Sequence, residues 1–327
     1  MNNMLEVTAL SKTYTDFTLD NISFRLPEGF IMGLIGPNGS GKTTTIKSIL
    51  NMVEPDSGSI TVFGKDHIAQ EQEIKRDIGV VFDNSYFVDE WSMTDVEKAY
   101  SLFYIGWNSE TYWSMLSKFR IAKEKRVKEL SKGMQMKLML ACAFSYDAKL
   151  LILDEPTSGL DPVSRDELLE ILSGYIEDGR HSVLFSTHIT SDLEKIADYI
   201  TYINLGKMIF TGSKEDFVEG YRIVSGDKKA LTPELKNHMI GTRTFATGYE
   251  ALIRTQDIPE DMQADALQAT IDDIVVFVSR QARRRRKDEP FHEMYEAVLP
   301  ASQTLLEIHA AGAAGAAAHH FFYRHAL

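Results

Sequence analysis

Residues 36–45 read GPNGSGKTTT, and this stretch decides the fold. It contains the pattern G-x-x-x-x-G-K-[ST], which binds phosphate groups where it joins a β-strand to an α-helix. The apolar residues 30–35 before it predict a strand, and the residues after it predict a helix that ends at the turn 55–58. The sequence therefore predicts a phosphate-binding loop in the context that this pattern requires.

Each residue type in this loop has a physical reason to be there. Glycines let backbone N–H groups turn toward phosphate oxygens, and the N-terminus of the next helix adds a partial positive charge. Lys42 can place a full charge on the β- and γ-phosphates, and the Thr43 hydroxyl can ligate Mg²⁺. Kinases and GTPases share this loop, so alone it indicates a nucleotide-binding protein of unspecified class. The residues expected to bind the nucleotide are Gly36, Pro37, Asn38, Gly39, Ser40, Gly41, Lys42, Thr43 and Thr44.

A second motif, LLILDEP at 150–156, is an apolar run that ends in two carboxylates. A continuous apolar run is typical of a parallel strand that is buried on both faces. We expect Asp154 to hold the Mg²⁺ shell through water and Glu155 to polarise the attacking water as a general base. Two acidic residues where a strand ends are ordinary by themselves, and the phosphate loop upstream is what favours this interpretation.

Three further motifs narrow the class of nucleotide protein. LSKGMQ precedes a predicted helix, for which Ser131 is a suitable N-cap, and Gly133 would let the backbone approach a ligand closely. SGLDP at 158–162 follows the acidic pair directly. SVLFSTH at 182–188 places His188 at the end of the next buried strand, where it could contact a γ-phosphate.

In this order, the motifs resemble those of the ATP-binding-cassette (ABC) ATPase family. The resemblance covers about residues 4–220 and rests on the phosphate loop, the signature loop LSKGMQ, the acidic strand, the dimer loop SGLDP and the switch histidine His188. It implies an α/β fold with a P-loop ATPase core, a mostly parallel sheet, an antiparallel β subdomain and a helical subdomain at about 84–147. The alternation of predicted strands and helices independently favours a parallel α/β core.

The resemblance also implies a function. The chain would hydrolyse ATP, with Mg²⁺, as the nucleotide-binding subunit of an ABC exporter, peripheral on the cytoplasmic side of the membrane and bound to separate transmembrane permease subunits. It would form a head-to-tail homodimer or heterodimer, which ATP closes and hydrolysis releases. In that dimer Ser131, Lys132 and Gly133 would contact the ATP of the other subunit, and Asp161 the facing subunit. The resemblance gives Tyr14 the role of stacking on adenine.

Two departures from the family pattern affect the site. Lys132 and Met134 stand where the signature has a glycine and a glutamine. Asp83 stands where the family has a glutamine that ligates Mg²⁺ and links to the membrane partner. A carboxylate is a hard oxygen ligand suited to Mg²⁺, so we expect Asp83 to replace that glutamine at the nucleotide and the metal.

Aromatic residues are concentrated in the segment 82–119, which holds all three tryptophans of the chain. The simpler interpretation is that they form the core of a small helical subdomain. The alternative is that some form a groove for a helix of another protein, since aromatic side chains are enriched at such sites. Tyr86, Phe87 and Trp91 are the residues favoured for contact with the permease, because they follow Asp83.

The region after residue 220 has a different character. Its short strand-like and helical pieces predict a small α+β accessory domain at 221–280 behind an ATPase domain at 1–220, with a helix at 269–280. Residues 281–327 contain a run of four arginines and an alanine-rich run, which predict a disordered or foreign tail. A solvated linker and a membrane-surface patch are both compatible with the arginines.

Composition excludes several other classes of protein. The chain has 327 residues, a net charge of −12 and one cysteine. The charge argues against a nucleic-acid partner, and the single cysteine excludes an intrachain disulfide. No stretch resembles a signal peptide or the roughly 20 apolar residues of a membrane span. Two alternatives to an exporter subunit stay open: a soluble ABC ATPase that acts on ribosomes or DNA, and a regulatory nucleotide switch that does not hydrolyse ATP.

Overall fold

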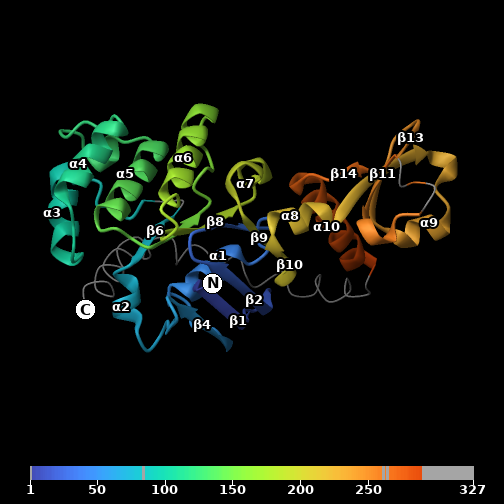
Figure 1. Ribbon diagram of the computed structural model, residues 1–327, viewed down its shortest axis with the longest axis horizontal. Helices are drawn as coiled ribbons and strands as arrows, with labels where there is room; N and C mark the ends of the chain where they lie inside the picture. Colours follow the sequence, from blue (N-terminus) through green and yellow to red (C-terminus); the bar gives the residue numbers. More distant parts are fainter. Residues whose placement is uncertain (1, 83–84, 260–261, 263–264, 289–327) are drawn as a thin grey trace, which may run out of the picture.

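The computed structural model describes residues 2–82, 85–259, 262 and 265–288 of the chain. Within these residues, one mixed sheet has ten strands in the order β5-β4-β1-β2-β10-β9-β3-β8-β7-β6 (Figure 1). Its strands are β1 (Asn3–Thr13), β2 (Thr18–Pro27), β3 (Ile31–Ile35), β4 (Ser57–Val62), β5 (Lys65–Asp66), β6 (Ile78–Val81), β7 (Leu150–Asp154), β8 (Ser182–Thr187), β9 (Tyr199–Asn204) and β10 (Lys207–Ser213).

One end of this sheet is parallel, and its strands are buried on both faces. β3, β8, β7 and β6 run parallel, and Asp154 of β7 is paired with Ser186 of β8. Every residue of β7 is buried, as its apolar sequence predicts. Alternate side chains of these strands enter two different hydrophobic cores, because successive side chains of a strand point to opposite faces. The parallel direction brings the loops that follow these strands to one edge of the sheet.

Helices cover both faces of the parallel strands (Figure 1). They and the remaining helices are α1 (Lys42–Ile49), α2 (Glu71–Lys75), α3 (Met93–Phe103), α4 (Ser109–Lys118), α5 (Lys132–Ser145), α6 (Pro162–Tyr175), α7 (Thr190–Ile196), α8 (Lys214–Glu219), α9 (Pro233–His238) and α10 (Ile271–Asp288). Buried side chains of α1 join the core that includes β1 and β2, whereas those of α5, α6 and α7 join the core on the other face.

Polar residues fix the start of the two helices that follow the signature and dimer loops. The Ser131 hydroxyl accepts the N–H of Met134 at 3.3 Å at the start of α5, which confirms the predicted N-cap. The Asp161 carboxylate accepts two N–H groups in the first turn of α6, each at 3.1 Å, and Pro162 occupies the first helical position. Both loops therefore have defined positions relative to the core.

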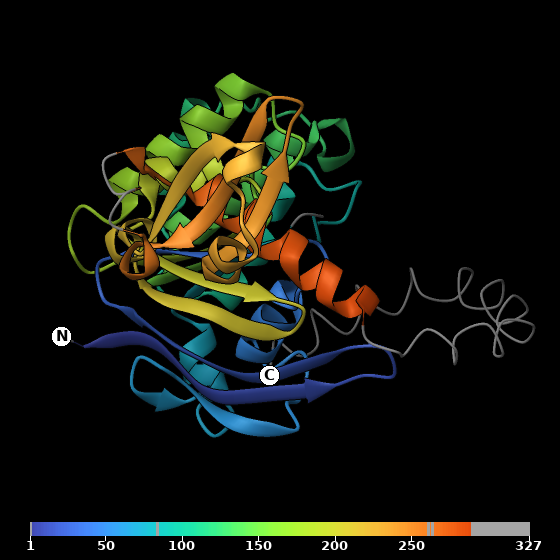
Figure 2. The same ribbon diagram turned by 90° about the vertical axis from the view of Figure 1, so that its right-hand side faces the viewer.

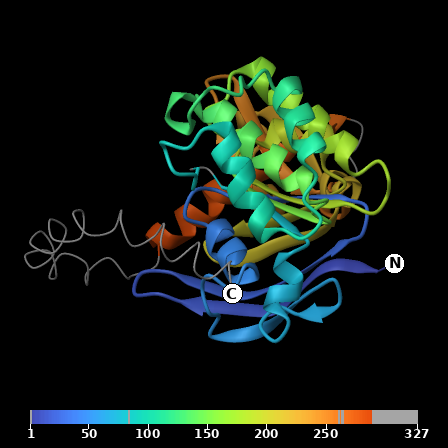
Figure 3. The same cartoon turned by 90° about the vertical axis from the view of Figure 1, so that its left-hand side faces the viewer.

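The subdomains implied by the family resemblance are also present. β1, β2, β4 and β5 form an antiparallel part of the sheet through their pairings, apart from a parallel contact between β2 and β10. β9 and β10 are a further antiparallel pair. α3, α4 and α5 form a helical layer at one end of the molecule, which faces the viewer in Figure 3. The observed architecture confirms the predicted α/β fold class.

A second, antiparallel sheet lies beyond residue 220 and faces the viewer in Figure 2. Its strand order is β12-β13-β11-β14. The strands are β11 (Tyr221–Asp227), β12 (Met239–Thr244), β13 (Gly248–Arg254) and β14 (Leu267–Gln268). We call residues 221–288 the accessory segment. α10 contacts both β12 and β13 of this sheet, and it also contacts α7 and α8.

The helix α10 differs in length from the prediction. It was expected at 269–280 and runs from Ile271 to Asp288, so it crosses the boundary placed at residue 280 and includes the arginine run. Arginine, lysine, glutamine and alanine all favour helix, and cations at a helix C-terminus are stabilised by the macrodipole. The remainder of the predicted tail lies outside the described residues.

Candidate active site

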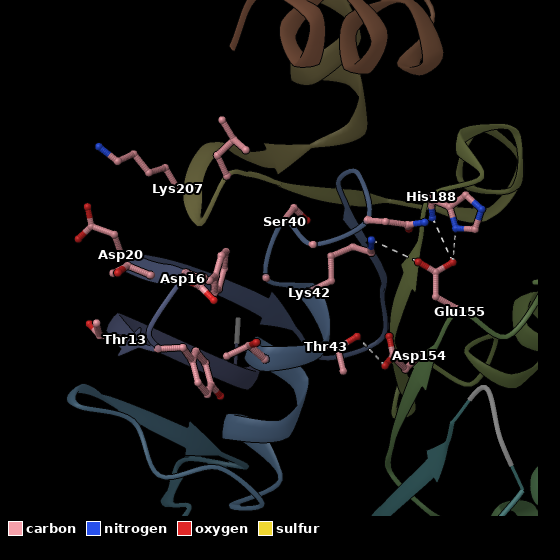
Figure 4. A pocket seen from close by; sticks show the side chains of 18 of the residues that line it. Thr13, Asp16, Asp20, Ser40, Lys42, Thr43, Asp154, Glu155, His188 and Lys207 are labelled. Atoms are coloured by element: carbon pink, nitrogen blue, oxygen red, sulfur yellow. Dashed lines mark hydrogen bonds and ion pairs between the residues drawn. The ribbon is translucent and has the colours of Figure 1, made fainter. Parts of the chain in front are cut away.

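A pocket of about 1090 Å³ lies where the phosphate loop meets the ends of β7 and β8 (Figure 4). Of the residues predicted to bind nucleotide, those that line it are Tyr14, Asn38, Gly39, Ser40, Gly41, Lys42, Thr43 and Thr44. Asp154, Glu155 and His188 line the same pocket. The fold thus brings together side chains that are more than 100 residues apart in the sequence.

The phosphate loop has a backbone that only glycine can adopt at two positions. Gly36 and Gly41 have φ values of +154° and +117°. A Cβ at Gly36 would lie 2.1 Å from the Ile203 carbonyl oxygen, so a side chain there would displace the loop from β9. Gly36 and Pro37 shape the loop without lining the pocket. The loop then passes directly into α1, and the first three residues of that helix line the pocket, as expected of a helix N-terminus that binds phosphate.

Lys42, Glu155 and His188 point toward one another across the pocket (Figure 4). Lys42 Nζ lies 3.2 Å from Glu155 Oε1 and also donates to the Gly36 carbonyl oxygen at 2.8 Å. His188 Nδ1 lies 2.6 Å from Glu155 Oε2, and the His188 N–H donates to the same oxygen at 3.3 Å. The Lys42 side chain is 6% exposed and that of Glu155 19%, so the pair is shielded from water. Two groups that can carry positive charge therefore hold one carboxylate at the centre of the pocket.

The backbone of Glu155 is in the left-handed region, with φ +54°. Residues with a Cβ seldom adopt this conformation, and it costs free energy that the surrounding structure must supply. Part of that support is visible, because the Glu155 N–H donates to the Ser186 carbonyl oxygen at 3.0 Å. The sharp turn directs Asp154 and Glu155 to different parts of the pocket.

Asp154 and Thr43 form a second polar contact on the pocket wall. The Thr43 hydroxyl donates to Asp154 Oδ2 at 3.0 Å, and the Ser186 hydroxyl donates to Asp154 Oδ1 at 2.6 Å. Hydroxyl and carboxylate oxygens are the ligands that Mg²⁺ prefers, and Mg²⁺ usually keeps waters and substrate phosphates as its other ligands. The described residues hold no cluster of three or more side chains able to bind a metal ion unaided. The pair fits Mg²⁺ that arrives with a nucleotide.

The signature loop and most of the dimer loop lie outside this pocket in the single chain, although Ser158 of the dimer loop lines it. Ser131, Lys132, Gly133 and Asp161 are absent from its lining. A Cβ at Gly133 would lie 2.9 Å from Leu160 Cδ2, and the Lys132 side chain lies against Gly159. The two loops therefore pack on each other and form one continuous surface.

Some residues of the site were not predicted from sequence. Ser186, which holds Asp154, was missed, although its place beside Asp154 follows from the pairing of β7 with β8. Asp83, predicted to bind both nucleotide and Mg²⁺, lies outside the described residues. Further lining residues without a prediction include Thr13, Asp16, Phe17, Asp20 and Lys207.

The aromatic segment is mostly core, as the simpler interpretation proposed. Tyr112 and Phe119 are buried, and Phe87 is only 8% exposed, so Phe87 cannot serve as a surface contact. Trp91 is half-buried against the same core. Tyr86 remains accessible at 39%, and partial burial together with the charge of Asp154 raises the pKa of its phenol.

Comparison with known proteins identifies the family. Residues 19–158 match the family model described as "ABC transporter". The "Nod factor export ATP-binding protein I" of Rhizobium etli is 37% identical over 224 residues, which are 66% of this chain and 70% of that protein. The "Lantibiotic transport ATP-binding protein SrtF" of Streptococcus pyogenes is 36% identical over 209 residues, 63% of this chain and 89% of that protein.

A solved structure agrees with these matches. The structure titled "Structure of ATP binding subunit of ABC transporter" is 30% identical and superimposes with a TM-score of 0.60 over 65% of this chain and 91% of that chain. The family resemblance predicted from the motifs is confirmed. This chain belongs to the ABC transporter family, as one of its ATP-binding proteins with ATPase activity.

Proposed function

We propose that this chain is the ATP-hydrolysing subunit of an exporter, with Lys42, Glu155 and His188 at the centre of its active site. The observation that carries this proposal is the arrangement of Glu155 between Lys42 and His188 beside the phosphate loop. The relatives named above export or transport a substrate, which supports export and does not favour the soluble or non-hydrolysing alternatives. The decisive test is the Glu155→Gln variant described in the Discussion.

In the proposed reaction a water oxygen attacks the γ-phosphorus of ATP. Glu155 takes a proton from that water, the bond from the γ-phosphorus to the β–γ bridging oxygen breaks, and ADP and phosphate leave. Lys42 moves from Glu155 to the β- and γ-phosphates, and His188 holds the freed carboxylate in place. Thr43 and Asp154 would hold Mg²⁺, which neutralises charge on the phosphate oxygens when bound. Asp83 stays a predicted further ligand.

Tyr14 is the proposed contact for the adenine ring. It follows β1, lines the pocket and is 43% exposed, so its ring is available for stacking. We expect Tyr14→Ala to weaken ATP binding roughly tenfold, because stacking of a base on an aromatic ring contributes about 1–3 kcal/mol. Titration with a fluorescent ATP analogue measures this loss. Tyr14→Phe should retain affinity, and Phe245→Ala, at a ring of equal exposure in the accessory segment, is the control. Equal affinity of Tyr14→Ala and the unchanged protein would contradict the stacking role.

We further propose that two ATPase chains form a head-to-tail dimer. Tyr14 and His188 of the pocket are exposed at 43% and 44%, and the signature loop with residues 159–161 forms a surface outside the pocket on the same chain. A second copy turned by 180° could bring Ser131, Lys132 and Gly133 over the nucleotide, with Asp161 at the facing chain. This arrangement explains why motifs that lie outside the pocket accompany it in the sequence.

The surface proposed for the permease lies at the end of α3, away from the accessory segment (Figure 1). Five apolar side chains are exposed there, although such residues are normally buried: Tyr86, Val88, Leu102, Phe103 and Ile105. The ring of Phe87 lies 5.6 Å from that of Tyr100 in α3, so the loop and the helix are neighbours. None of the helices in the described part of the chain is long and apolar enough to cross a membrane. A permease bound here would place this chain on the cytoplasmic face of the membrane.

A charge in this surface should separate membrane attachment from catalysis. Leu102 is 82% exposed, so we expect Leu102→Glu to reduce the membrane-bound fraction of the chain in the source cells at least fivefold. ATP hydrolysis by the purified variant should be unchanged, because the pocket is not touched. Ile68→Glu, at an exposed apolar residue elsewhere, should stay bound and serves as the control. Full retention of Leu102→Glu on membranes would exclude this surface.

A further inference from the structure

The helix α7 links the active site to the accessory segment. It begins at Thr190, two residues after His188, and has only seven residues. Ile189 at its N-cap provides no side-chain hydrogen bond to the first turn. A helix this short is not stable by itself, so its position depends on the elements that pack around it.

Two of these elements belong to the ATPase core. Leu193 packs so closely on β3 that a Cβ at Gly33 would lie 2.6 Å from its Cδ1. Asp192, only 2% exposed, faces Arg165 of α6 with 4.0 Å between Asp192 Oδ1 and Arg165 Nε. These contacts hold the middle of α7 against the sheet and α6.

The first turn of α10 provides two further contacts. The Thr190 hydroxyl donates to Asp272 Oδ1 at 3.0 Å, and the Ile271 N–H donates to Glu194 Oε1 at 3.2 Å. Thr190 is 7% exposed. The contact with Asp272 is the one nearest to His188 and lies at the first residue of α7.

α10 is itself fixed to the ATPase core. Ile271, Ile274 and Phe277 are buried in the same hydrophobic core as Leu193. Farther along α10, the Tyr202 hydroxyl of β9 lies 3.0 Å from Ser279 Oγ and donates to the Val275 carbonyl oxygen at 3.3 Å. The helix can therefore act as a rigid support for α7.

We propose that Asp272 and Thr190 are positioning residues for His188. By holding the first residue of α7, Asp272 fixes the end of the segment 188–190 and so keeps the His188 imidazole against Glu155. The accessory segment is then part of the hydrolytic machinery. This inference rests on the proposed roles of Glu155 and His188.

The test compares variants of the full chain in steady-state ATP hydrolysis. We expect Asp272→Ala and Thr190→Val each to lower kcat about fivefold, with KM for MgATP within twofold, because neither side chain lines the pocket. Thr190→Ser keeps the hydroxyl and should keep kcat. The double variant should be no slower than the slower single variant, since both remove one interaction.

Two matched controls address loss of structure. Asp273 is next to Asp272, but its carboxylate accepts from Thr270 at 2.7 Å within the start of α10. Asp273→Ala therefore removes a contact within α10 and none with α7. Tyr202→Phe removes the hydroxyl that contacts Val275 and Ser279 of α10. Both variants should retain kcat. Hydrogen exchange of amides 188–197 gives a readout independent of activity, and it should be faster in Asp272→Ala than in Asp273→Ala.

The outcomes distinguish this inference from the proposed function. If His188→Ala lowers kcat but Asp272→Ala and Thr190→Val do not, only the positioning role is overturned. A loss of kcat that is equal in Asp273→Ala, or that follows thermal stability across the variants, also overturns it. If His188→Ala retains kcat, the proposed role of His188 fails, and the positioning role fails with it.

Discussion

Replacing Glu155 by glutamine is expected to lower kcat for ATP by roughly 10²- to 10⁴-fold, the usual contribution of a general base. Glutamine has the same shape but cannot take a proton from water. ATP binding should persist or strengthen, because the substitution removes a negative charge beside the γ-phosphate. ATP should then accumulate in a closed dimer, which light scattering detects as a doubling of the molecular mass.

Glu170→Gln is the matched control for this experiment. Glu170 is an exposed residue of α6 that does not line the pocket, so its variant should hydrolyse ATP normally and stay monomeric after turnover. Hydrolysis by Glu155→Gln at the normal rate would exclude Glu155 as the base. If Glu155→Gln loses hydrolysis but forms no dimer with ATP, the role of Glu155 as the base is supported and the proposed head-to-tail dimer is contradicted.

Replacing Lys42 by alanine is expected to weaken ATP binding roughly 10- to 100-fold, since hydrogen bonds to charged groups contribute about 1.5–3 kcal/mol. The Lys42 side chain is 6% exposed and follows the phosphate loop directly, so its charge is held beside the site expected for phosphate. Hydrolysis at saturating ATP should also fall, because Lys42 would stabilise charge on the γ-phosphate. Calorimetric titration with ATP measures the affinity directly.

Lys47→Ala provides the comparison for this second experiment. Lys47 is in the last turn of the same helix, α1, and does not line the pocket. Its removal changes the net charge equally, so a general electrostatic effect would weaken both variants alike. A loss of affinity confined to Lys42→Ala supports direct contact with phosphate.

The sequence predicted those parts of the site that depend on local patterns. The phosphate loop needs particular glycines and a lysine in a fixed order, and β7 needs an apolar run before its carboxylates. Such requirements appear directly in the residues. The sequence therefore predicted Lys42, Glu155 and His188 as site residues, and the structure places all three in one pocket. The α/β fold followed from the alternation of strands and helices.

Other features depend on contacts between distant residues and could not be predicted in this way. The concentration of aromatic residues in the segment 82–119 does not show which of them are buried: Phe87 is buried, whereas Tyr86 beside it is exposed. The contact of Thr190 with Asp272 joins residues 82 positions apart. Ser186 could have been placed beside Asp154 only by knowing the register of β7 and β8.

The ion pair between Lys42 and Glu155 makes the protein's own carboxylate a competitor for every ligand of the phosphate loop. A small singly charged anion that binds Lys42 must displace a carboxylate oxygen already 3.2 Å away, and it gains little in return. A triphosphate would also accept hydrogen bonds from the backbone N–H groups of the loop, so it can displace the Glu155 carboxylate from Lys42. On this argument the pocket would favour ligands of high negative charge, and such a ligand would release Glu155 for its proposed role as the base.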